Sequence, residues 1–221
     1  MNTEQAYIKF QLKVNQNFEN SKIAVDRGRF VLFYNEAQNK MVEAILDKKS
    51  NDEIRYIQKL LVPNYSISDS KNTELATLFS LPKNYFDFSS AYAKASTEKC
   101  KEQVIYLFEI KDDNKFEILQ DEFNGPSFLA REAPMIISSD SLHAFKKDFV
   151  YDSLYLSYYR YPLQIKLLTE EDPESQFDPS VNPEFDDKFT DRIITMASSL
   201  FEQNNSNPKY QIDMQRAIQK M

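Results

Sequence analysis

Four carboxylates near the end of the sequence are the side chains best suited to chemistry: Glu184, Asp186, Asp187 and Asp191. Asp187 and Asp191 are one helical turn apart, so they could share a helix face and hold Mg²⁺ with oxygen ligands. That pattern would suit a Mg²⁺-dependent hydrolase that uses Asp186, Asp187 and Asp191. The dipole at a helix start also stabilises acidic side chains, and this explains the cluster without an ion. We favour the helix-dipole explanation and expect no metal site here.

The other residues that often serve in catalysis are few and scattered. The chain has one histidine, His143, and one cysteine, Cys100, which could act as a pair only if the fold brought them together. Ser127 lacks the flanking glycines of a nucleophile elbow. The only glycines are Gly28 and Gly125, so glycine-rich loops for phosphates or dinucleotides are excluded. We therefore expect no catalytic residues and no cofactor, so the chain is not expected to be an enzyme.

The composition narrows the kinds of partner. The 221 residues carry a net charge of −7 and no long basic run, which argues against tight binding of DNA or RNA. A single cysteine rules out an internal disulfide, and no apolar run approaches the roughly 20 residues that cross a bilayer. We expect a protein of a reducing cytoplasm with no membrane partner. Aromatic residues make up 14% of the chain, with 13 Tyr, and tyrosine is common in protein interfaces.

Three helices are predicted in the first 62 residues from apolar side chains that recur every three or four positions. The stripe of the first consists of Tyr7, Phe10, Val14 and Phe18. The second begins near Asp26, a suitable N-cap, and its stripe consists of Phe30, Phe33, Ala37, Met41, Ala44 and Ile45. The third begins with a capping box of Ser50 and Glu53, and Pro63 is expected to end it.

Short β-favouring runs over residues 74–82, 102–111, 133–138, 141–147 and 149–162 predict an antiparallel sheet, interrupted by a short helix over 114–123. An acidic loop leads to two C-terminal helices. Each opens with Asn-Pro, at Asn182 and at Asn207, since Asn suits the N-cap and Pro the first helical position. The apolar stripe of the second consists of Tyr210, Met214, Ala217, Ile218 and Met221.

These elements predict the α+β class: N-terminal helices, a central antiparallel β-sheet domain and two C-terminal helices. The expected divisions are a helical segment over residues 1–62, a β-rich domain over 63–168, and the acidic loop with the helical pair over 169–221, forming one compact unit. The helices outnumber those that one modest sheet can accept, so some of them must pack elsewhere, on another copy of the protein for example.

The run LYLSYYRYPLQI (154–165) predicts a strand with two faces suited to burial. Leu154 and Leu156 point to one side, while Tyr155, Tyr159 and Tyr161 point to the other, since strand side chains alternate. Either the subunit's own helices or a neighbouring subunit could cover the tyrosine side. The surplus of helices favours the neighbour.

Several motifs in a shared order resemble the ring, or neck, proteins of crAss-like short-tailed phages. They are LPKNYFDFSSAYA (81–93), LFEIKDDN, LQDEFNGPSFLARE (119–132), LYLSYYRYP and DPSVNPEFDDKFTDRIITMAS (178–198). More loosely, they are similar to head–tail adaptor subunits of short-tailed phages. The resemblance covers about residues 81–198 and extends more weakly to the N-terminal helices.

The resemblance implies a structural protein of the virion: one subunit of a homo-oligomeric ring, a dodecamer if it follows the portal, in the connector that joins capsid to tail. Its partners would be the portal and the adjacent ring or tail proteins. DNA would pass nearby without specific binding, and assembly would occur in the bacterial host cytoplasm. A tail-tube or tail-hub subunit of the same virion, the Mg²⁺-dependent enzyme and a host-encoded interaction protein remain as alternatives. The candidate subunit-interface residues are Tyr155, Tyr159, Arg160, Tyr161, Arg131 and Phe128.

Overall fold

The computed structural model describes residues 1–17, 24–48, 51–68, 70–111, 115–121, 123–167 and 181–206. The chain divides into two compact units. The first, the helical unit, combines Met1–Lys59 with Pro162–Met221, and the second, the sheet unit, is the continuous stretch Leu60–Tyr161. The structure is α+β, as the sequence predicts. The sequence predicted divisions between residues 62 and 63 and between residues 168 and 169. In the structure the two units divide between residues 59 and 60 and between residues 161 and 162.

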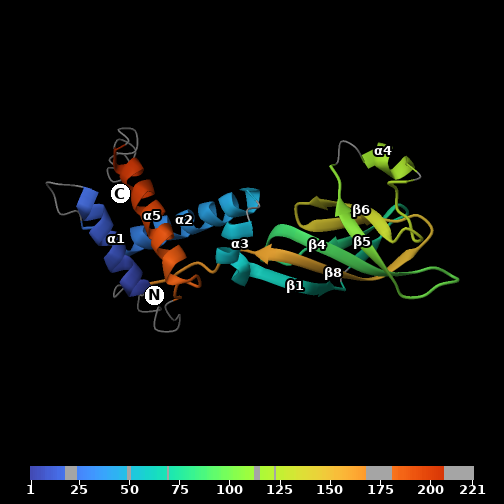
Figure 1. Ribbon diagram of the computed structural model, residues 1–221, viewed down its shortest axis with the longest axis horizontal. Coiled ribbons are helices and arrows are strands. Elements are labelled where there is room, and N and C mark those ends of the chain that lie inside the picture. Colours follow the sequence, from blue (N-terminus) through green and yellow to red (C-terminus); the bar gives the residue numbers. More distant parts are fainter. Residues whose placement is uncertain are drawn as a thin grey trace, which may run out of the picture. The chain divides into compact units, whose positions relative to one another are not determined.

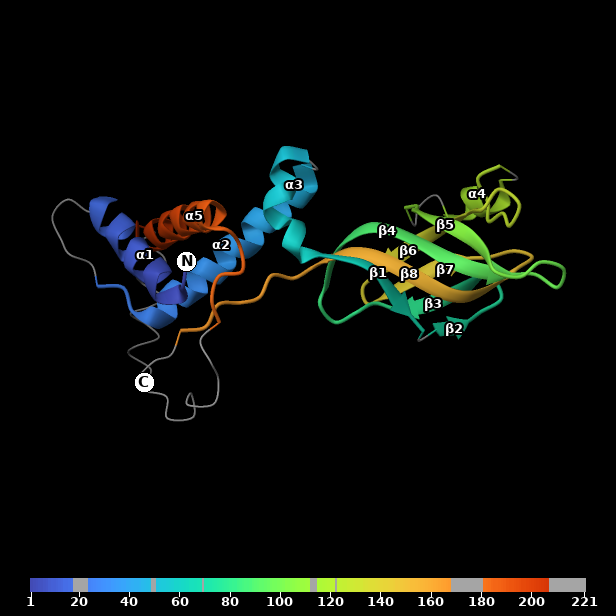
Figure 2. The same cartoon turned by 60° about the horizontal axis from the view of Figure 1, so that its bottom comes forward.

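The helical unit is built from α1 (Thr3–Asn17), α2 (Arg27–Lys48), the short α3 (Asn51–Ile57) with the 3₁₀ turn η1 (Gln58–Leu60), and α5 (Asp187–Ser206). Helices α1, α2 and α5 pack against one another around an aromatic core (Figures 1 and 2). Phe10 of α1, Phe33 of α2 and Phe201 of α5 meet there, with ring centroids 5.9 Å apart for Phe10–Phe201 and 5.6 Å for Phe33–Phe201. The predicted stripes therefore cover other helices rather than the sheet.

Side-chain caps fix where these helices begin. Asp26 Oδ1 accepts a hydrogen bond from the Arg29 N–H at 2.8 Å, which confirms Asp26 as the N-cap of α2. The first of the two C-terminal helices was expected to begin at Asn182, but α5 begins at Asp187 because Asp186 Oδ1 caps the Phe189 N–H at 2.8 Å. Asn182 Oδ1 instead accepts from the Thr3 N–H at 3.0 Å, at the start of α1.

Part of the prediction for the helical regions concerns residues that the structure does not describe: Phe18, Ser50 and the second C-terminal helix. Pro63 does not follow directly on a helix end, because the helical turn stops at Leu60 and Pro63 lies inside a strand.

The extended segment that follows the sheet is bound by side chains of the helical unit, which form the backbone hydrogen bonds that a neighbouring strand would form in a sheet. The Asn35 amide accepts from the Ile165 N–H at 2.9 Å and donates to the Ile165 carbonyl at 3.3 Å. Gln38 Nε2 donates to the Leu163 carbonyl at 3.0 Å, and Glu184 Oε1 accepts from the Leu163 N–H at 2.7 Å. Every one of these bonds goes to the backbone of the segment. They therefore satisfy N–H and carbonyl groups that have no neighbouring strand to bond with.

The sheet unit contains eight strands. They are β1 (Leu61–Ile67), β2 (Ser70–Asn72), β3 (Ala76–Ser80), β4 (Tyr85–Ser96), β5 (Gln103–Glu109), β6 (Glu132–Ser138), β7 (Ser141–Phe145) and β8 (Val150–Arg160). Their order across the sheet is β1-β8-β4-β5-β6-β7-β3-β2. The segments predicted as strands correspond to β3, β5, β6, β7 and β8, and the short predicted helix corresponds to α4 (Lys115–Gln120). Strands β1, β2 and β4 were not predicted.

The sheet is mixed, so the prediction of a purely antiparallel sheet was wrong. Strands β5 and β6 pair in parallel, with Leu107 opposite Ala133, because the connection through α4 returns the chain to the starting end before β6 begins. All other strand pairs are antiparallel.

The inner face of the sheet holds the core of this unit. Ile67 of β1 and Phe79 of β3 belong to one buried cluster although five strands lie between β1 and β3 in the sheet order, which shows that the sheet is curled. The fully buried residues that β4 supplies to this face are alanines, Ala91, Ala93 and Ala95. Small side chains on a central strand leave room for large ones from facing strands.

Candidate interaction surface

The outer face of the sheet is covered at one end by α4, which lies beside β5 and β6 in both views (Figures 1 and 2). Ile118 and Leu119 of α4 pack against a second, smaller buried cluster, which consists of Ala76, Ile110 and Phe145. This cover leaves strands β5, β4 and β8 as the part of the outer face whose aromatic side chains are exposed or half-buried.

Three tyrosines form a row across those strands, which we call the tyrosine ladder: Tyr106 of β5, Tyr92 of β4 and Tyr155 of β8. Tyr92 is the register partner of both Tyr106 and Tyr155, so the three side chains are direct cross-strand neighbours. The rings of Tyr92 and Tyr155 stack with centroids 5.0 Å apart and an interplanar angle of 14°. Tyr106 is 62% exposed.

The surroundings of the tyrosine ladder combine apolar, neutral and charged side chains. Two residues along β5 from Tyr106, and therefore on the same face, Phe108 is also exposed. The row is continued by Ser66 of β1 beside Tyr155 and by Glu132 of β6 beside Tyr106. Lys94, two residues from Tyr92 on β4, places a cation next to the rings. The arrangement offers an aromatic surface with polar hydroxyl tips, a composition enriched in protein interfaces.

Strand β8 has the two faces that the sequence predicts. Leu154, Leu156 and Tyr158 are buried on the inner face, while Tyr155 and Tyr159 are half-buried on the outer face. Partial burial, together with the nearby Asp87 charge, raises the pKa of the Tyr159 hydroxyl.

The remaining candidate interface residues lie apart from the tyrosine ladder. Tyr161 follows β8 and its ring centroid lies 4.4 Å from that of Phe86, and Arg160 Nη1 donates to the Tyr161 carbonyl at 3.0 Å. Phe128 packs against the inner core cluster, with its ring 5.9 Å from Phe149. Arg131 is exposed, with a φ of 62°, and its carbonyl accepts from the Tyr106 N–H at 2.8 Å. The structure therefore joins Tyr155, from this set, to two tyrosines that the sequence analysis did not select.

Tyr92 and Tyr106 were missed because β4 was not predicted. The stretch SSAYAKAS has few β-branched or aromatic residues. Its period of two was visible, however, since small apolar residues at 91, 93 and 95 alternate with Tyr92 and Lys94. Only the pairing of β4 with both β5 and β8 then places the three tyrosines in one row.

The connection between β5 and β6 displays further apolar side chains. Phe116, Phe123 and Leu129 are all more than two-thirds exposed, and Leu129 reaches 92%. Gly125 is needed in this loop, because a Cβ there would lie 2.6 Å from the Asp121 carbonyl oxygen. The loop is thus a second exposed apolar feature on the same unit.

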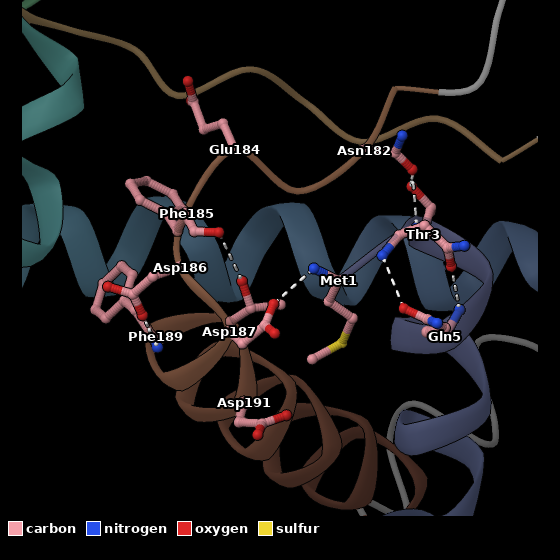
Figure 3. A network of polar contacts seen from close by, with 12 residues as sticks. Met1, Thr3, Gln5, Asn182, Glu184, Phe185, Asp186, Asp187, Phe189 and Asp191 are labelled. Atoms are coloured by element: carbon pink, nitrogen blue, oxygen red, sulfur yellow. Dashed lines mark hydrogen bonds and ion pairs between the residues drawn. The ribbon is translucent and has the colours of Figure 1, made fainter.

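The carboxylates near α5 each have a separate structural partner (Figure 3). Glu184 accepts from the Leu163 N–H and Asp186 caps α5, as described above. The Met1 amino group donates to Asp187 Oδ1 at 2.6 Å, and this bond holds the pKa of Asp187 below its ordinary value. Asp191 pairs with Lys9 Nζ at 2.7 Å. Within the described ranges, no three acidic, histidine or cysteine side chains gather as a metal-binding group.

The remaining candidates for chemistry are bonded locally. Cys100 is exposed in the turn after β4, where its N–H donates to Thr97 Oγ1 at 3.0 Å. His143 Nε2 lies 3.0 Å from Ser141 Oγ on β7. Ser127 Oγ accepts from the Ala130 N–H at 3.0 Å. Each of these contacts joins residues two or three positions apart in a turn or a strand, and Cys100 and His143 bond to different partners.

No known family model matches the chain, and a search of curated proteins finds no match. In the part of the chain that the structure describes, no helix is both long and apolar enough to cross a bilayer.

Proposed function

We propose that this chain is a structural protein of a tailed-phage virion, one subunit of a ring in the portal–neck–tail connector that surrounds the DNA channel. It acts as an assembly module: it binds copies of itself, the portal and the adjacent ring or tail proteins, and it catalyses no reaction. The observation that carries this proposal is the exposed tyrosine ladder on the sheet unit, together with the order of motifs shared with ring proteins of crAss-like phages.

The tyrosine ladder supports an assembly role because of its energetics. Tyrosine rings bury a large area at a small entropy cost, and they are frequent hot spots where proteins meet. A stacked, strand-mounted pair such as Tyr92 and Tyr155 is already fixed before binding, so less freedom is lost on association. An exposed sheet face is suited to a neighbouring subunit rather than to a small ligand, which is held best in a concave pocket.

The acidic charge also suits a subunit beside a DNA channel. A net charge of −7 disfavours adhesion to phosphates, so DNA can slide past without being held. The alternative is a subunit of the tail tube or tail hub of the same virion. The position of the protein in the particle distinguishes this alternative from a connector subunit.

The direct test is location. Purified particles of the phage that carries this gene should contain the protein by mass spectrometry, and a reconstruction should place a closed ring of it next to the portal. Density in the tail tube or hub would favour that alternative. Particles that lack the protein entirely would overturn the proposal.

The role of the tyrosine ladder is tested with Tyr106→Ala. Leu32→Ala on α2 is a matched control, because Leu32 is 63% exposed and lies in the helical unit. Both isolated variants should melt like the parent, since exposed substitutions usually change stability by about 0.5 kcal/mol or less. Only Tyr106→Ala should reduce incorporation into particles. Equal incorporation of the two variants would show that the ladder is not a subunit contact.

A further inference from the structure

A tightly bonded turn lies between α4 and β6, and we call its residues 127–132 the bridged turn. Ser127 and Glu132 form an antiparallel bridge across it. The Ser127 N–H donates to the Glu132 carbonyl at 2.9 Å, and the Glu132 N–H donates to the Ser127 carbonyl at 3.3 Å. Ser127 Oγ also accepts from the Ala130 N–H at 3.0 Å. These bonds within the turn fix its conformation before any partner binds.

Two further bonds and one packed ring fasten the bridged turn to the sheet. Gln103 Nε2 donates to the Phe128 carbonyl at 2.7 Å, and the Tyr106 N–H donates to the Arg131 carbonyl at 2.8 Å. The Phe128 ring packs against the inner core cluster. Because Glu132 is the register partner of Tyr106, the bridged turn adjoins the tyrosine ladder.

The bridged turn presents one apolar and one cationic side chain to solvent. Leu129 is 92% exposed, and Arg131 is exposed as well. Arg131 takes part in no ion pair among the described residues. Arginine is enriched in protein interfaces, and a preformed turn loses little freedom when it binds. The turn therefore has the chemistry of a binding element.

The backbone at Arg131 is strained. Its φ of 62° lies in the left-handed region, which is unfavourable for a residue with a Cβ atom. Glycine adopts this conformation without that cost. Strain at an exposed residue whose charge has no partner in its own chain points to a function for the side chain.

The helical unit exposes a surface of complementary chemistry on α2. Glu43 and Asp47 are one helical turn apart and exposed, and neither takes part in an ion pair among the described residues. Like charges at this spacing repel, and a cation between them removes the repulsion. Ala44 lies between them in the sequence and is also exposed. The surface thus offers carboxylates to Arg131 and a small apolar contact to Leu129.

We propose that the bridged turn binds a second copy of this chain, on the exposed face of α2 around Glu43, Ala44 and Asp47. Arg131 pairs with the two carboxylates, and Leu129 lies against Ala44. Because the two surfaces differ, the contact is heterologous and can repeat around a ring. The inference rests on the proposed function for its place in a ring, whereas the contact itself is tested on purified protein. Particles that lack the protein would overturn the proposed function and leave those tests unaffected.

Disulfide trapping between two full-length chains tests the contact. One chain carries Leu129→Cys, and a second, tagged chain carries Ala44→Cys, both in a Cys100→Ser background that removes the native thiol. Oxidation of the mixture should give a dimer of one tagged and one untagged chain. Phe123→Cys replaces Leu129→Cys in the control, because Phe123 is 91% exposed in the same connection. The absence of the mixed dimer, or equal yields from the two positions, would overturn the proposal.

Charge reversal gives an independent readout of the ion pairs. Arg131→Glu should weaken self-association of the purified chain by about tenfold or more, as measured by sedimentation, since it places like charges together. Adding Glu43→Lys and Asp47→Lys to the same chain should restore association. Lys83→Glu, at another exposed lysine of the sheet unit, changes the net charge equally and should have little effect. A parent chain that stays monomeric, a failed rescue, or equal weakening by Lys83→Glu would contradict the contact.

Arg131→Gly separates binding from folding. It should raise Tm by about 2 °C, because glycine adopts a positive φ without strain. It should nevertheless weaken self-association, because the guanidinium is lost. A lower Tm together with weaker association would mean that Arg131 serves folding rather than binding, and unchanged association would show that its side chain is not in the contact.

Discussion

The acidic residues around the start of α5 show how single side chains fix the ends of chain segments. Asp186 caps α5, Glu184 holds the segment at Leu163, and Asp187 and Asp191 pair with groups of α1. A charged cap acts on a backbone N–H that has no partner in the helix, so its effect is largest where that N–H is withdrawn from solvent.

Replacing Asp186 by Ala should lower the free energy of unfolding by about 0.5–2 kcal/mol, the usual cost of losing an N-cap. Asp191→Ala serves as the control, because the half-exposed pair of Asp191 with Lys9 should contribute less than about 1 kcal/mol. Urea unfolding of the two variants measures the difference. An equal loss in both would show that Asp186 does not cap the helix.

A buried tyrosine should make the protein sensitive to alkali. The Tyr151 hydroxyl donates to the Phe145 carbonyl at 2.6 Å, and burial raises the pKa of Tyr151 above its ordinary value. In the unfolded chain the same group ionises near pH 10. Above that pH the unfolded state holds fewer protons than the folded state, so the free energy of unfolding falls as pH rises.

Tyr151→Phe isolates this effect from other groups that titrate. At pH 8 the variant should be the less stable protein, because it lacks the bond to Phe145. Between about pH 10 and 11 the gap between parent and variant should narrow, since only the parent loses stability through Tyr151. Urea unfolding at several pH values measures the gap, and a constant gap would argue against the linkage.

At the scale of elements, one face of β8 packs into the core, and the other face belongs to the candidate interaction surface. Tyr158 points inward, where Tyr85 and Tyr65 surround its ring, and its hydroxyl donates to Asn84 Oδ1 at 2.9 Å. Tyr159, one residue later, points outward.

Tyr158→Ala should therefore lower the free energy of unfolding by about 3–5 kcal/mol, as expected for the loss of a buried aromatic ring. Tyr159→Ala together with Tyr161→Ala should leave the melt of the isolated protein nearly unchanged. Thermal melting decides, and a strongly destabilised double variant would place the outer tyrosines in the core.

The edges of the sheet are poor sites for adding another strand. Edge strand β1 contains Pro63, which has no N–H, and its register shifts between Val62 and Tyr65, where Asn64 has a φ of 50°. The other edge, β2, is only three residues long. Short or interrupted edges protect against pairing with other chains. Contacts between subunits are therefore expected on the outer face rather than along an edge.

At the scale of the whole molecule, the two units differ in how the chain builds them. The sheet unit is continuous, from Leu60 to Tyr161, and has its own core cluster. The helical unit requires both ends of the chain, since α5 supplies Phe189, Ile193 and Phe201 to the core that α1 and α2 begin.

Residues 60–161 expressed alone should therefore fold. The expected result is a β-type circular dichroism spectrum with a cooperative urea transition. Residues 1–59 alone should show no cooperative transition, because their apolar stripes lack α5. If residues 60–161 failed to unfold cooperatively, the two units would depend on each other for folding.

Local patterns were enough to predict the α+β class, the buried Phe10 of α1 and Phe33 of α2, and most strands, since helix and strand periods appear directly in the order of residues. Ala44, which was predicted in the apolar stripe of α2, is exposed. The two faces of β8 were predicted in the same way. The predicted helix start at Asn182 was wrong, because two nearby side chains could each cap a helix: Asn182 bonds to the Thr3 N–H at the start of α1, and Asp186 caps α5.

Only the tertiary structure decided which residues form the candidate surface. The tyrosine ladder joins residues 92, 106 and 155, which are neighbours only because β4 lies between β5 and β8. The sequence of a strand shows which of its side chains share a face, but it does not show which other strands will pair with it. Likewise, the parallel pairing of β5 with β6 depends on the path of the connection through α4, and it leaves part of the outer face covered and the tyrosines exposed.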